Sequence, residues 1–400
     1  MQTDLFAPLT GIRVLDASRV LAGPFCGQVL GDLGAEVIKV ERPGQGDETR
    51  AWGPPFSGDL SAYYLSCNRN KRAITLDLAR KEGLELFHEL VKRCDVLLEN
   101  FKASSAEKMG LTPQKLLDIN PRLIVCSISG FGRSGPLSDL PGYDFAVQAL
   151  SGLMSITGPV EGPPCKVGVA VTDVQTGLYA AIAVLACLQA RARSGHGYAI
   201  DMALLDCAVA AQVNLAQAFL TSGSVPPRQG NAHLQIVPYQ LFATADGWLV
   251  LAVGNDGQWQ RFCACAGQSD LAANERFATN TLRVKNRHLL VPLLEQVLKS
   301  RRTSAWQEVL QAAEVPHAPV WDYEALFAQP QAGARGLRVT VADHQGQPVD
   351  LLGSPFHITG TAMPDPEMPP RLSQDTKEVL TRVLGLDAER IDELRKLNVI

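Results

Sequence analysis

The 400-residue sequence has little excess charge of either sign. It contains 37 basic and 41 acidic residues, which gives a formal net charge of −4 at pH 7. A protein that binds a nucleic-acid backbone usually carries a concentrated basic surface, and the sequence has no block of like charges. Nucleic acid is therefore not an expected partner.

Long apolar runs are also missing, although 46% of the residues are apolar. No uninterrupted apolar stretch reaches the roughly 18 residues that a membrane-spanning helix needs. The first residues, MQTDLFAPLTGIRVLD, include acidic side chains where a leader would be basic and apolar. We expect a folded, cytoplasmic protein without membrane contact.

The sequence contains none of the common metal or nucleotide motifs. Its nine cysteines form no CxxC pair and its seven histidines no HxxxH pair, so we expect reduced thiols and no metal. Glycines 23, 27, 31 and 34 run along a predicted helix and do not form GxGxxG, and no GxxxxGK[ST] occurs. Dinucleotide and nucleoside-triphosphate motifs are thereby excluded, and close helix packing explains Gly27 and Gly31 better.

The first 130 residues alternate short β-branched runs with amphipathic segments, which predicts a parallel, doubly wound α/β sheet. The pattern predicts strands at 12–17, 36–41, 73–78, 96–100 and 123–129, and helices at 23–33 and 81–93.

The rest of the chain predicts a second, smaller domain. An alanine-rich helix at 174–193 is apolar nearly all round and is expected to be buried, and a further helix is expected at 203–221. A proline-rich linker and a hairpin at Asp246-Gly247 follow. We predict a large Rossmann-like domain over 1–224, a small α+β domain over 225–325, and a return to the large domain over 326–400.

Basic side chains gather near the ends of the predicted strands. Each one alone fits a solvated surface charge, but together they fit a rim for a phosphorylated ligand. Phe101 either stacks on a base or belongs to the core. The basic residues are Lys39, Arg42, Arg50, Arg69, Lys71, Arg72, Lys102 and Lys108.

Two aspartates, Asp144 and Asp173, stand in glycine-punctuated turns before predicted helices. Such a turn fixes a carboxylate for nucleophilic work and brings backbone amides close to it. Asp173 also fits an N-cap of the helix that follows. The local pattern leaves cap and nucleophile open.

Several longer motifs resemble one known family. They are LTGIRVLDASRVLAGPFCGQVLGDLGAEVIKVERPGQGDETR, YYLSCNRNKRAITLDL, DVLLENF, RLIVCSISGFG and GYDFAVQALSGLMSITG. The chain resembles the class III CoA-transferases, the formyl-CoA and carnitine CoA-transferase family that also contains α-methylacyl-CoA racemase. The resemblance is closest to the branch that transfers CoA between succinate and hydroxymethylglutarate or glutarate.

The resemblance implies an interlocked, ring-like homodimer with a Rossmann-like large domain built from both termini. It implies no permanently bound cofactor, because CoA thioesters are the substrates. Asp173 matches the position of the family's nucleophile, which forms a mixed anhydride and then an aspartyl-CoA thioester. An ordinary aspartate pKa of about 3.9 would leave it ionised at neutral pH. CoA contacts carried over by position are Leu21, Arg42, Leu76, Asn100, Phe101, Lys108, Gly142 and Tyr143.

The same branch implies transfer from succinyl-CoA to a C4 to C6 dicarboxylic acid such as glutarate, hydroxymethylglutarate or itaconate. A buried distal carboxylate needs a polar partner, and the candidates are Arg50, Arg72, Lys166, His233 and Gln235. The glycine loop of oxalate-using members is replaced here by Asn231, Ala232, His233 and Gln235, so oxalate is not an expected acceptor.

Two alternatives stay open. A racemase of this family has histidine and aspartate where this chain has Tyr143-Asp144, and a tyrosine with a pKa near 10 exchanges protons poorly at neutral pH. The other alternative is a CoA-binding protein without catalytic activity.

Overall fold

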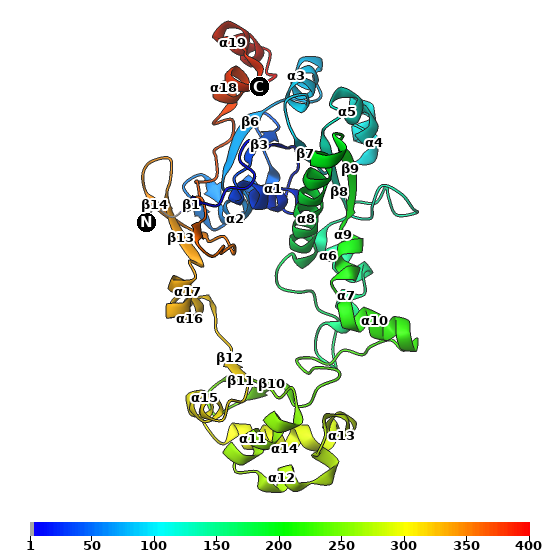
Figure 1. Cartoon of the computed structure of the whole chain (residues 1–400), viewed down its shortest axis with the longest axis vertical. Helices are drawn as coiled ribbons and strands as arrows, with labels where there is room; N and C mark the ends of the chain where they lie inside the picture. The colour runs from blue at the N-terminus through cyan, green and yellow to red at the C-terminus, as the bar shows by residue number, and fades with distance from the viewer. Residues whose placement is uncertain (1–3) are drawn as a thin grey trace. The chain divides into compact units, whose positions relative to one another are not determined.

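A computed structural model of the chain describes residues 4–400 (Figure 1). Spatial contacts divide the chain into two units. The first unit contains the chain up to Leu153, Val167–Thr221 and Pro330–Ile400, and the second contains Met154–Lys166 and Ser222–Gln329. Residues 154–166 thus group with the second unit, although they lie outside the small domain predicted from the sequence.

The first unit is built on a six-stranded parallel sheet, as the βαβ alternation predicted. The strand order is β6-β3-β2-β7-β8-β9, and every neighbouring pair is parallel. The order reverses direction between β2 and β7, and ligands of such sheets bind where this reversal occurs. The strands are β2 (Arg13–Asp16), β3 (Glu36–Glu41), β6 (Lys71–Thr75), β7 (Val96–Glu99), β8 (Ile124–Ser129) and β9 (Tyr198–Ala203).

Helices connect these strands, and the unit also contains short two-stranded sheets. The helices up to residue 222 are α1 (Ala22–Asp32), α2 (Ala62–Cys67), α3 (Lys81–Val91), α4 (Ala103–Met109), α5 (Pro113–Ile119), α6 (Asp144–Leu150), α7 (Leu153–Ile156), α8 (Val171–Ser194), α9 (Leu204–Ala210) and α10 (Val213–Ser222). Most of α7 belongs to the second unit. The C-terminal helices are α17 (Pro330–Ala334), α18 (Thr376–Val379) and α19 (Ala388–Lys396). The short strands are β1 (Asp4–Leu5) with β15 (Thr361–Ala362), β4 (Phe56–Ser57) with β5 (Leu60–Ser61), and β13 (Arg338–Ala342) with β14 (Pro348–Leu352).

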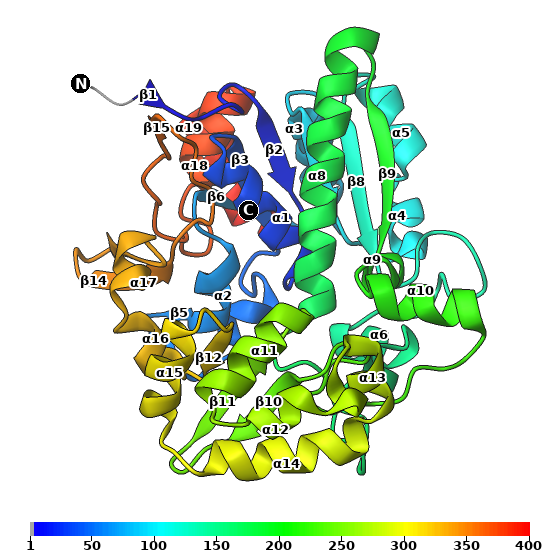
Figure 2. The ribbon, with the colours of Figure 1, turned by 60° about the horizontal axis from the view of Figure 1, so that its bottom comes forward.

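Each face of the large sheet is covered by its own hydrophobic core, because successive strand residues point to opposite sides. Val14 packs in one core with residues of α1 and α8 such as Leu30 and Val184. Leu15 packs in the other core with Phe87 of α3 and Val379 of α18. Helices α1 and α8 lie side by side on the first face (Figure 2).

Glycines allow α1 to approach its neighbours closely. A Cβ at Gly177 of α8 would lie 2.7 Å from the Ala22 carbonyl oxygen. A Cβ at Gly27 would lie 3.0 Å from Asp16 Oδ2, and one at Gly31 would lie 3.1 Å from Asn70. Close packing, and not a phosphate loop, therefore accounts for these glycines.

Helices α8 to α10 differ from the prediction in two ways. Side chains Leu178 and Ile182 of α8 are exposed within one chain, so the helix is not buried all round. The single helix expected at 203–221 is broken into α9 and α10, which meet at 79°. Gln212 lies at the break, and its Nε2 donates to the Ala208 carbonyl oxygen at 3.2 Å.

By length and composition alone, α8 is long and apolar enough to cross a membrane, and α9 with α10 is a second candidate if the bent pair is taken as one span. A core helix has the same length and composition, and α8 is such a helix on its α1 side.

The second unit has a core of its own. The predicted hairpin at Asp246-Gly247 is present, and its second strand also pairs with β12. Trp259, Phe262 and Trp306 are fully buried beneath the helices. The elements are β10 (Tyr239–Ala243), β11 (Trp248–Ala252), β12 (His317–Pro319), α11 (Asp256–Cys265), α12 (Ser269–Ala273), α13 (Asn280–Lys285), α14 (Arg287–Lys299), α15 (Thr303–Ala312) and α16 (Tyr323–Phe327).

Two fully buried ion pairs lie at β2, β3 and β6 of the first unit. Lys71 Nζ donates to Asp16 Oδ2 at 2.9 Å, to the Pro24 carbonyl oxygen at 2.7 Å and to Asn68 Oδ1 at 3.0 Å. All three ammonium protons thus have partners, which a buried charge requires. Lys39 Nζ donates to Asp47 Oδ2 at 2.9 Å and to the Ser18 carbonyl oxygen at 3.1 Å.

Lys71→Met is expected to destabilise the protein by about 3 kcal/mol or more, because it leaves the buried Asp16 carboxylate without its cation. Lys81→Met is the matched control, since this exposed lysine pairs only loosely with Glu85 at 3.8 Å, and it should change stability by less than about 0.5 kcal/mol. Urea denaturation at one fixed protein concentration measures both. Equal stability of the two variants would contradict the role of the pair.

Candidate functional site

A cavity of about 540 Å³ opens in the first unit where the strand order reverses. Loops after β2, β7 and β8 form its walls, and the first turn of α8 contributes Asp173. Its lining includes Arg19, Val20, Leu21, Glu48, Asn100, Phe101, Lys102, Arg133, Asp139, Gly142, Tyr143, Asp144 and Asp173.

The loop after β2 is fixed by side chains from other segments. Asn100 accepts from the Arg19 amide at 3.1 Å and donates to the Arg19 carbonyl oxygen at 2.9 Å. The next residue, Val20, has a φ of +72°, a conformation that β-branched residues rarely adopt. Its amide donates to Asp47 Oδ2 at 3.2 Å, and Asp47 is the partner of Lys39. The buried charges therefore hold this wall of the cavity.

Two glycines cross closely beneath the cavity. A Cβ at Gly130 would lie 2.3 Å from Gly142 Cα, and a Cβ at Gly142 would lie 2.0 Å from Gly130 Cα. Only glycine fits either position. The crossing fixes the backbone just before Tyr143, whose side chain is 69% exposed.

Asp144 caps the helix that carries Asp173. Its Oδ1 accepts from the Thr172 amide at 2.9 Å and from Thr172 Oγ1 at 2.7 Å, and its Oδ2 accepts from Gln148 Nε2 at 2.7 Å. Asp173 itself lies inside the first turn and makes no capping bond, since Ala170 is the N-cap residue. The cap interpretation of Asp173 is therefore wrong.

Asp173 has an unusual protonation equilibrium. Burial, and then the negative charge of Asp144, raise its pKa to about 7. The carboxyl group is therefore partly protonated at neutral pH, unlike the fully ionised group expected from the sequence. Because the folded state holds this proton more tightly than the unfolded chain, the resulting stabilisation is present below the ordinary pKa of 3.8 and is lost as pH rises through about 7.

Other charged and aromatic side chains of the site were not predicted from the sequence. Arg133 lines the cavity and pairs with the buried Glu99, and burial raises the pKa of that glutamate. Arg19 pairs with Glu48 at 2.5 Å. Burial and then the negative charge of the Asp173 carboxylate raise the pKa of the Tyr63 phenol on α2. Only their position after strand ends could have indicated the two arginines.

The structure brings together most of the residues predicted to contact CoA. Leu21, Asn100, Phe101, Gly142 and Tyr143 all line the cavity with Asp173.

Three others lie outside the cavity lining. Leu76 is 2% exposed and belongs to the core below the sheet. Arg42 and Lys108 are exposed, and Arg42 Nη1 reaches Gln45 Oε1 at 3.4 Å.

The residues predicted to bind a distal carboxylate are spread over both units. Arg50 is engaged by Glu41 at 2.6 Å and stacks on the Tyr64 ring, with its Cζ 3.9 Å from the ring centroid. Arg72 pairs with Glu367 at 3.2 Å.

Lys166, His233 and Gln235 belong to the second unit. There, the Gln235 amide donates to His233 Nδ1 at 3.0 Å, and the His233 ring packs edge-on against Tyr239. These contacts order the segment around His233 and Gln235.

The arrangement suits nucleophilic chemistry at a carboxylate. Among residues 4–400, none donates a hydrogen bond to the Asp173 carboxylate, so its oxygens face the cavity without a competing partner. A carboxylate that is poorly solvated and has a raised pKa is a stronger nucleophile toward a carbonyl carbon. The site therefore fits attack on an acyl group brought into the cavity.

Comparison with known proteins gives one consistent result. Residues 9–376 match the model of CoA-transferase family III. The chain is 46% identical to a succinate–glutarate CoA-transferase of Agrobacterium fabrum over 94% of this chain and 96% of that protein. It is 41% identical to a human succinyl-CoA:glutarate CoA-transferase, covering 98% of this chain and 90% of that protein. A crystal structure of a CAIB/BAIF family protein from Brucella suis matches with a TM-score of 0.84 and 43% identity, covering 96% and 100% of the two chains.

Asp144→Asn is expected to lower the pKa of Asp173 from about 7, because it removes the neighbouring negative charge and keeps an oxygen for the Thr172 amide. Asp139→Asn is the matched control, since Asp139 lines the same cavity but does not shift Asp173. A carboxyl-carbon NMR titration of 13C-aspartate protein, assigned with Asp173→Asn, measures the pKa. An unchanged value in Asp144→Asn would contradict the assigned cause.

Proposed function

The chain belongs to CoA-transferase family III and is a CoA-transferase, and on that premise we propose that it moves CoA from succinyl-CoA to glutarate or a similar short dicarboxylic acid, with Asp173 as nucleophile. The substrates are those in the names of its relatives. The observation that carries the proposal is the Asp173 carboxylate, which faces the cavity without a hydrogen-bond donor among the described residues.

The proposed reaction begins with attack of an Asp173 oxygen on the thioester carbonyl. The C–S bond breaks, and a mixed anhydride and the CoA thiolate form. The thiolate attacks the aspartyl carbonyl and releases succinate, leaving an aspartyl-CoA thioester. Glutarate attacks this thioester and regenerates a mixed anhydride with free thiolate. The thiolate then attacks the glutaryl carbonyl, which gives glutaryl-CoA and restores the Asp173 carboxylate.

This sequence consumes no proton, because carboxylates and thiolates replace one another at each step. The nucleophile must nevertheless be deprotonated at the start, and its pKa of about 7 leaves only part of the enzyme ready at neutral pH. The same raised pKa favours attack, since nucleophilicity increases with basicity. By raising the pKa, Asp144 therefore lowers the fraction of enzyme with an ionised Asp173 and makes each ionised carboxylate more reactive.

We assign the thiol end of CoA to the part of the cavity lined by Gly142 and Tyr143, and its adenine or pantetheine arm to the part lined by Leu21 and Phe101. Arg42 and Lys108 stay candidates for the phosphate groups, since they are exposed and a phosphate group can remain in water there.

For the distal carboxylate of the diacid, Arg50 and Arg72 are weak candidates. Each would have to exchange an existing carboxylate partner, Glu41 or Glu367, for the substrate. Lys166, His233 and Gln235 stay candidates, and the family resemblance implies that His233 and Gln235 lie where oxalate-using members have a glycine loop.

We further propose a homodimer of the interlocked kind that the family resemblance implies, in the cytoplasm and without membrane contact. Exposed apolar side chains support a protein partner, because a monomer rarely leaves such surface in water. These are Leu178 and Ile182 on α8 and Phe219 and Leu220 on α10.

Neither alternative function gains a specific observation. A racemase would need a second proton-transferring group beside Asp173, and Asp144 already accepts hydrogen bonds from Thr172 and Gln148. A CoA-binding protein without activity has no need of a carboxylate with a raised pKa in its ligand cavity.

Asp173→Ala is expected to lower the rate of succinyl-CoA:glutarate exchange by about a thousandfold or more, because the covalent route is lost. It should still bind CoA, as measured by calorimetry. Asp139→Asn is the control and should keep nearly normal rates. Transfer at wild-type rates by Asp173→Ala, or equal turnover of monocarboxylates in a panel of acids, would contradict the proposal.

Ile182→Glu is expected to reduce the yield of dimer, because it places a charge on the exposed apolar side of α8. Wild type should sediment with about twice the 43.1 kDa chain mass. Arg193→Glu, an exposed change on the same helix, serves as the control. A wild-type protein that sediments as a monomer at micromolar concentration would refute the dimer.

A further inference from the structure

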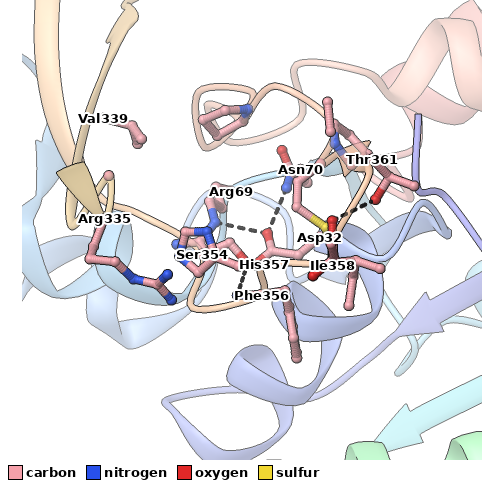
Figure 3. Close-up of a pocket in the computed structure, with 16 residues that line it drawn as sticks. Asp32, Arg69, Asn70, Arg335, Val339, Ser354, Phe356, His357, Ile358 and Thr361 are labelled. Atoms are coloured by element: carbon pink, nitrogen blue, oxygen red, sulfur yellow. Dashed lines mark hydrogen bonds and ion pairs between the residues drawn. The ribbon is translucent and has the colours of Figure 1, made fainter. Parts of the chain in front are cut away.

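A second cavity of the first unit shares no lining residue with the Asp173 cavity. It has a volume of about 520 Å³ and lies between the end of α1, the residue that follows α17, and the loop between β14 and β15 (Figure 3). Its lining comprises Asp32, Arg69, Asn70, Arg335, Gly336, Val339, Ser354, Phe356, His357, Ile358, Thr359, Thr361, Ala362, Met363, Pro364 and Pro366.

The carboxylate of this cavity is already neutralised. Asp32 receives both Nε and Nη2 of Arg69, at 2.8 and 2.5 Å, and Asn70 Nδ2 donates to the same carboxylate at 2.8 Å. The remaining Arg69 nitrogen, Nη1, donates to the Leu352 carbonyl oxygen at 3.0 Å. This fork-to-fork pair leaves no net charge and fixes one wall.

Two other basic groups of the cavity have no such counterion. In the part of the chain that the structure describes, neither the Arg335 guanidinium nor the His357 ring has an ion-pair or hydrogen-bond partner. Figure 3 shows the Arg335 guanidinium extending toward the side of the cavity where Ser354 and His357 lie. The lining therefore carries the uncompensated positive charge of Arg335 beside the hydrogen-bond donors of Ser354 and His357, and this arrangement favours binding of an anion. A guanidinium binds a carboxylate through two parallel hydrogen bonds.

Beside the hydroxyl groups of Ser354, Thr359 and Thr361, the lining has an apolar part. Val339, Phe356, Ile358 and Met363 come from three segments that meet around the cavity, and Pro364 and Pro366 extend this surface. A free phosphate would leave this apolar surface exposed to water. An alkyl chain would cover it, and burial of the apolar surface would stabilise the complex. The lining thus matches a molecule that is anionic at one end and apolar along its length.

We infer that this cavity binds a small carboxylic acid with an alkyl chain, whose carboxylate lies between Arg335 and His357. The chain packs along Val339, Phe356 and Met363. The site is separate from the Asp173 cavity, and its existence does not depend on the proposed transferase reaction. A ligand there links β13, the loop after β14 and the end of α1.

Equilibrium dialysis of the full-length protein with 14C-hexanoate and 14C-acetate tests the inference. Hexanoate is expected to bind one molecule per chain, about tenfold or more tighter than acetate, because each buried methylene adds to the affinity. Arg335→Gln should weaken hexanoate binding about tenfold or more, since it removes the charge-assisted hydrogen bonds. His357→Gln should weaken it less.

Arg338→Gln is the matched control, because Arg338 is an exposed neighbour on β13 that pairs with Asp350 at 3.7 Å and does not line the cavity. It should leave binding unchanged. Hexanoate binding that Arg335→Gln does not alter, or acetate binding as tight as hexanoate, would overturn the inference. Absence of binding together with a changed sedimentation coefficient of Arg335→Gln would also overturn it, and would instead assign the cavity to an acidic group of a second copy.

Discussion

The site depends on the Asp144 carboxylate, which caps the N-terminus of α8, the helix that carries Asp173. Asp144 receives the amide and hydroxyl of Thr172 at the start of α8, so the next residue, Asp173, needs no capping bond and turns its carboxylate to the cavity. A carboxylate that capped its own helix would be held by amides, and its pKa would fall. Here the pKa rises to about 7 because burial and Asp144 both disfavour the second charge. Asp144 thus influences both the position and the protonation of the proposed nucleophile.

The cavity exists because the sheet reverses its strand order between β2 and β7 and the loops at this point are held apart. Asn100 binds the loop after β2 through both of its amide atoms, and Asp47 holds the strained Val20 while it neutralises Lys39. Charged groups buried at 0% exposure are costly unless fully paired. Their pairing here fixes the loops before any ligand arrives.

Much of this architecture could be predicted from local sequence. The strand at 36–41, the parallel sheet and the place of Asp173 at the start of α8 follow from short-range patterns. Contacts between distant residues could not be predicted. No local signal reveals that Thr172 is capped by Asp144, 28 residues away, or that Arg50 is engaged by Glu41 and not by a ligand. The hydrophobic pattern also gives no sign of the break between α9 and α10.

The most direct test is chemical trapping of the proposed covalent intermediate on Asp173. The enzyme is mixed with succinyl-CoA, reduced with borohydride during turnover and digested, and the peptide that contains residue 173 is sequenced by mass spectrometry. Reduction of an aspartyl thioester gives the corresponding alcohol, so the account predicts homoserine at position 173 and aspartate at position 144. Turnover with an unmodified residue 173, or with the modification at another residue, would contradict it.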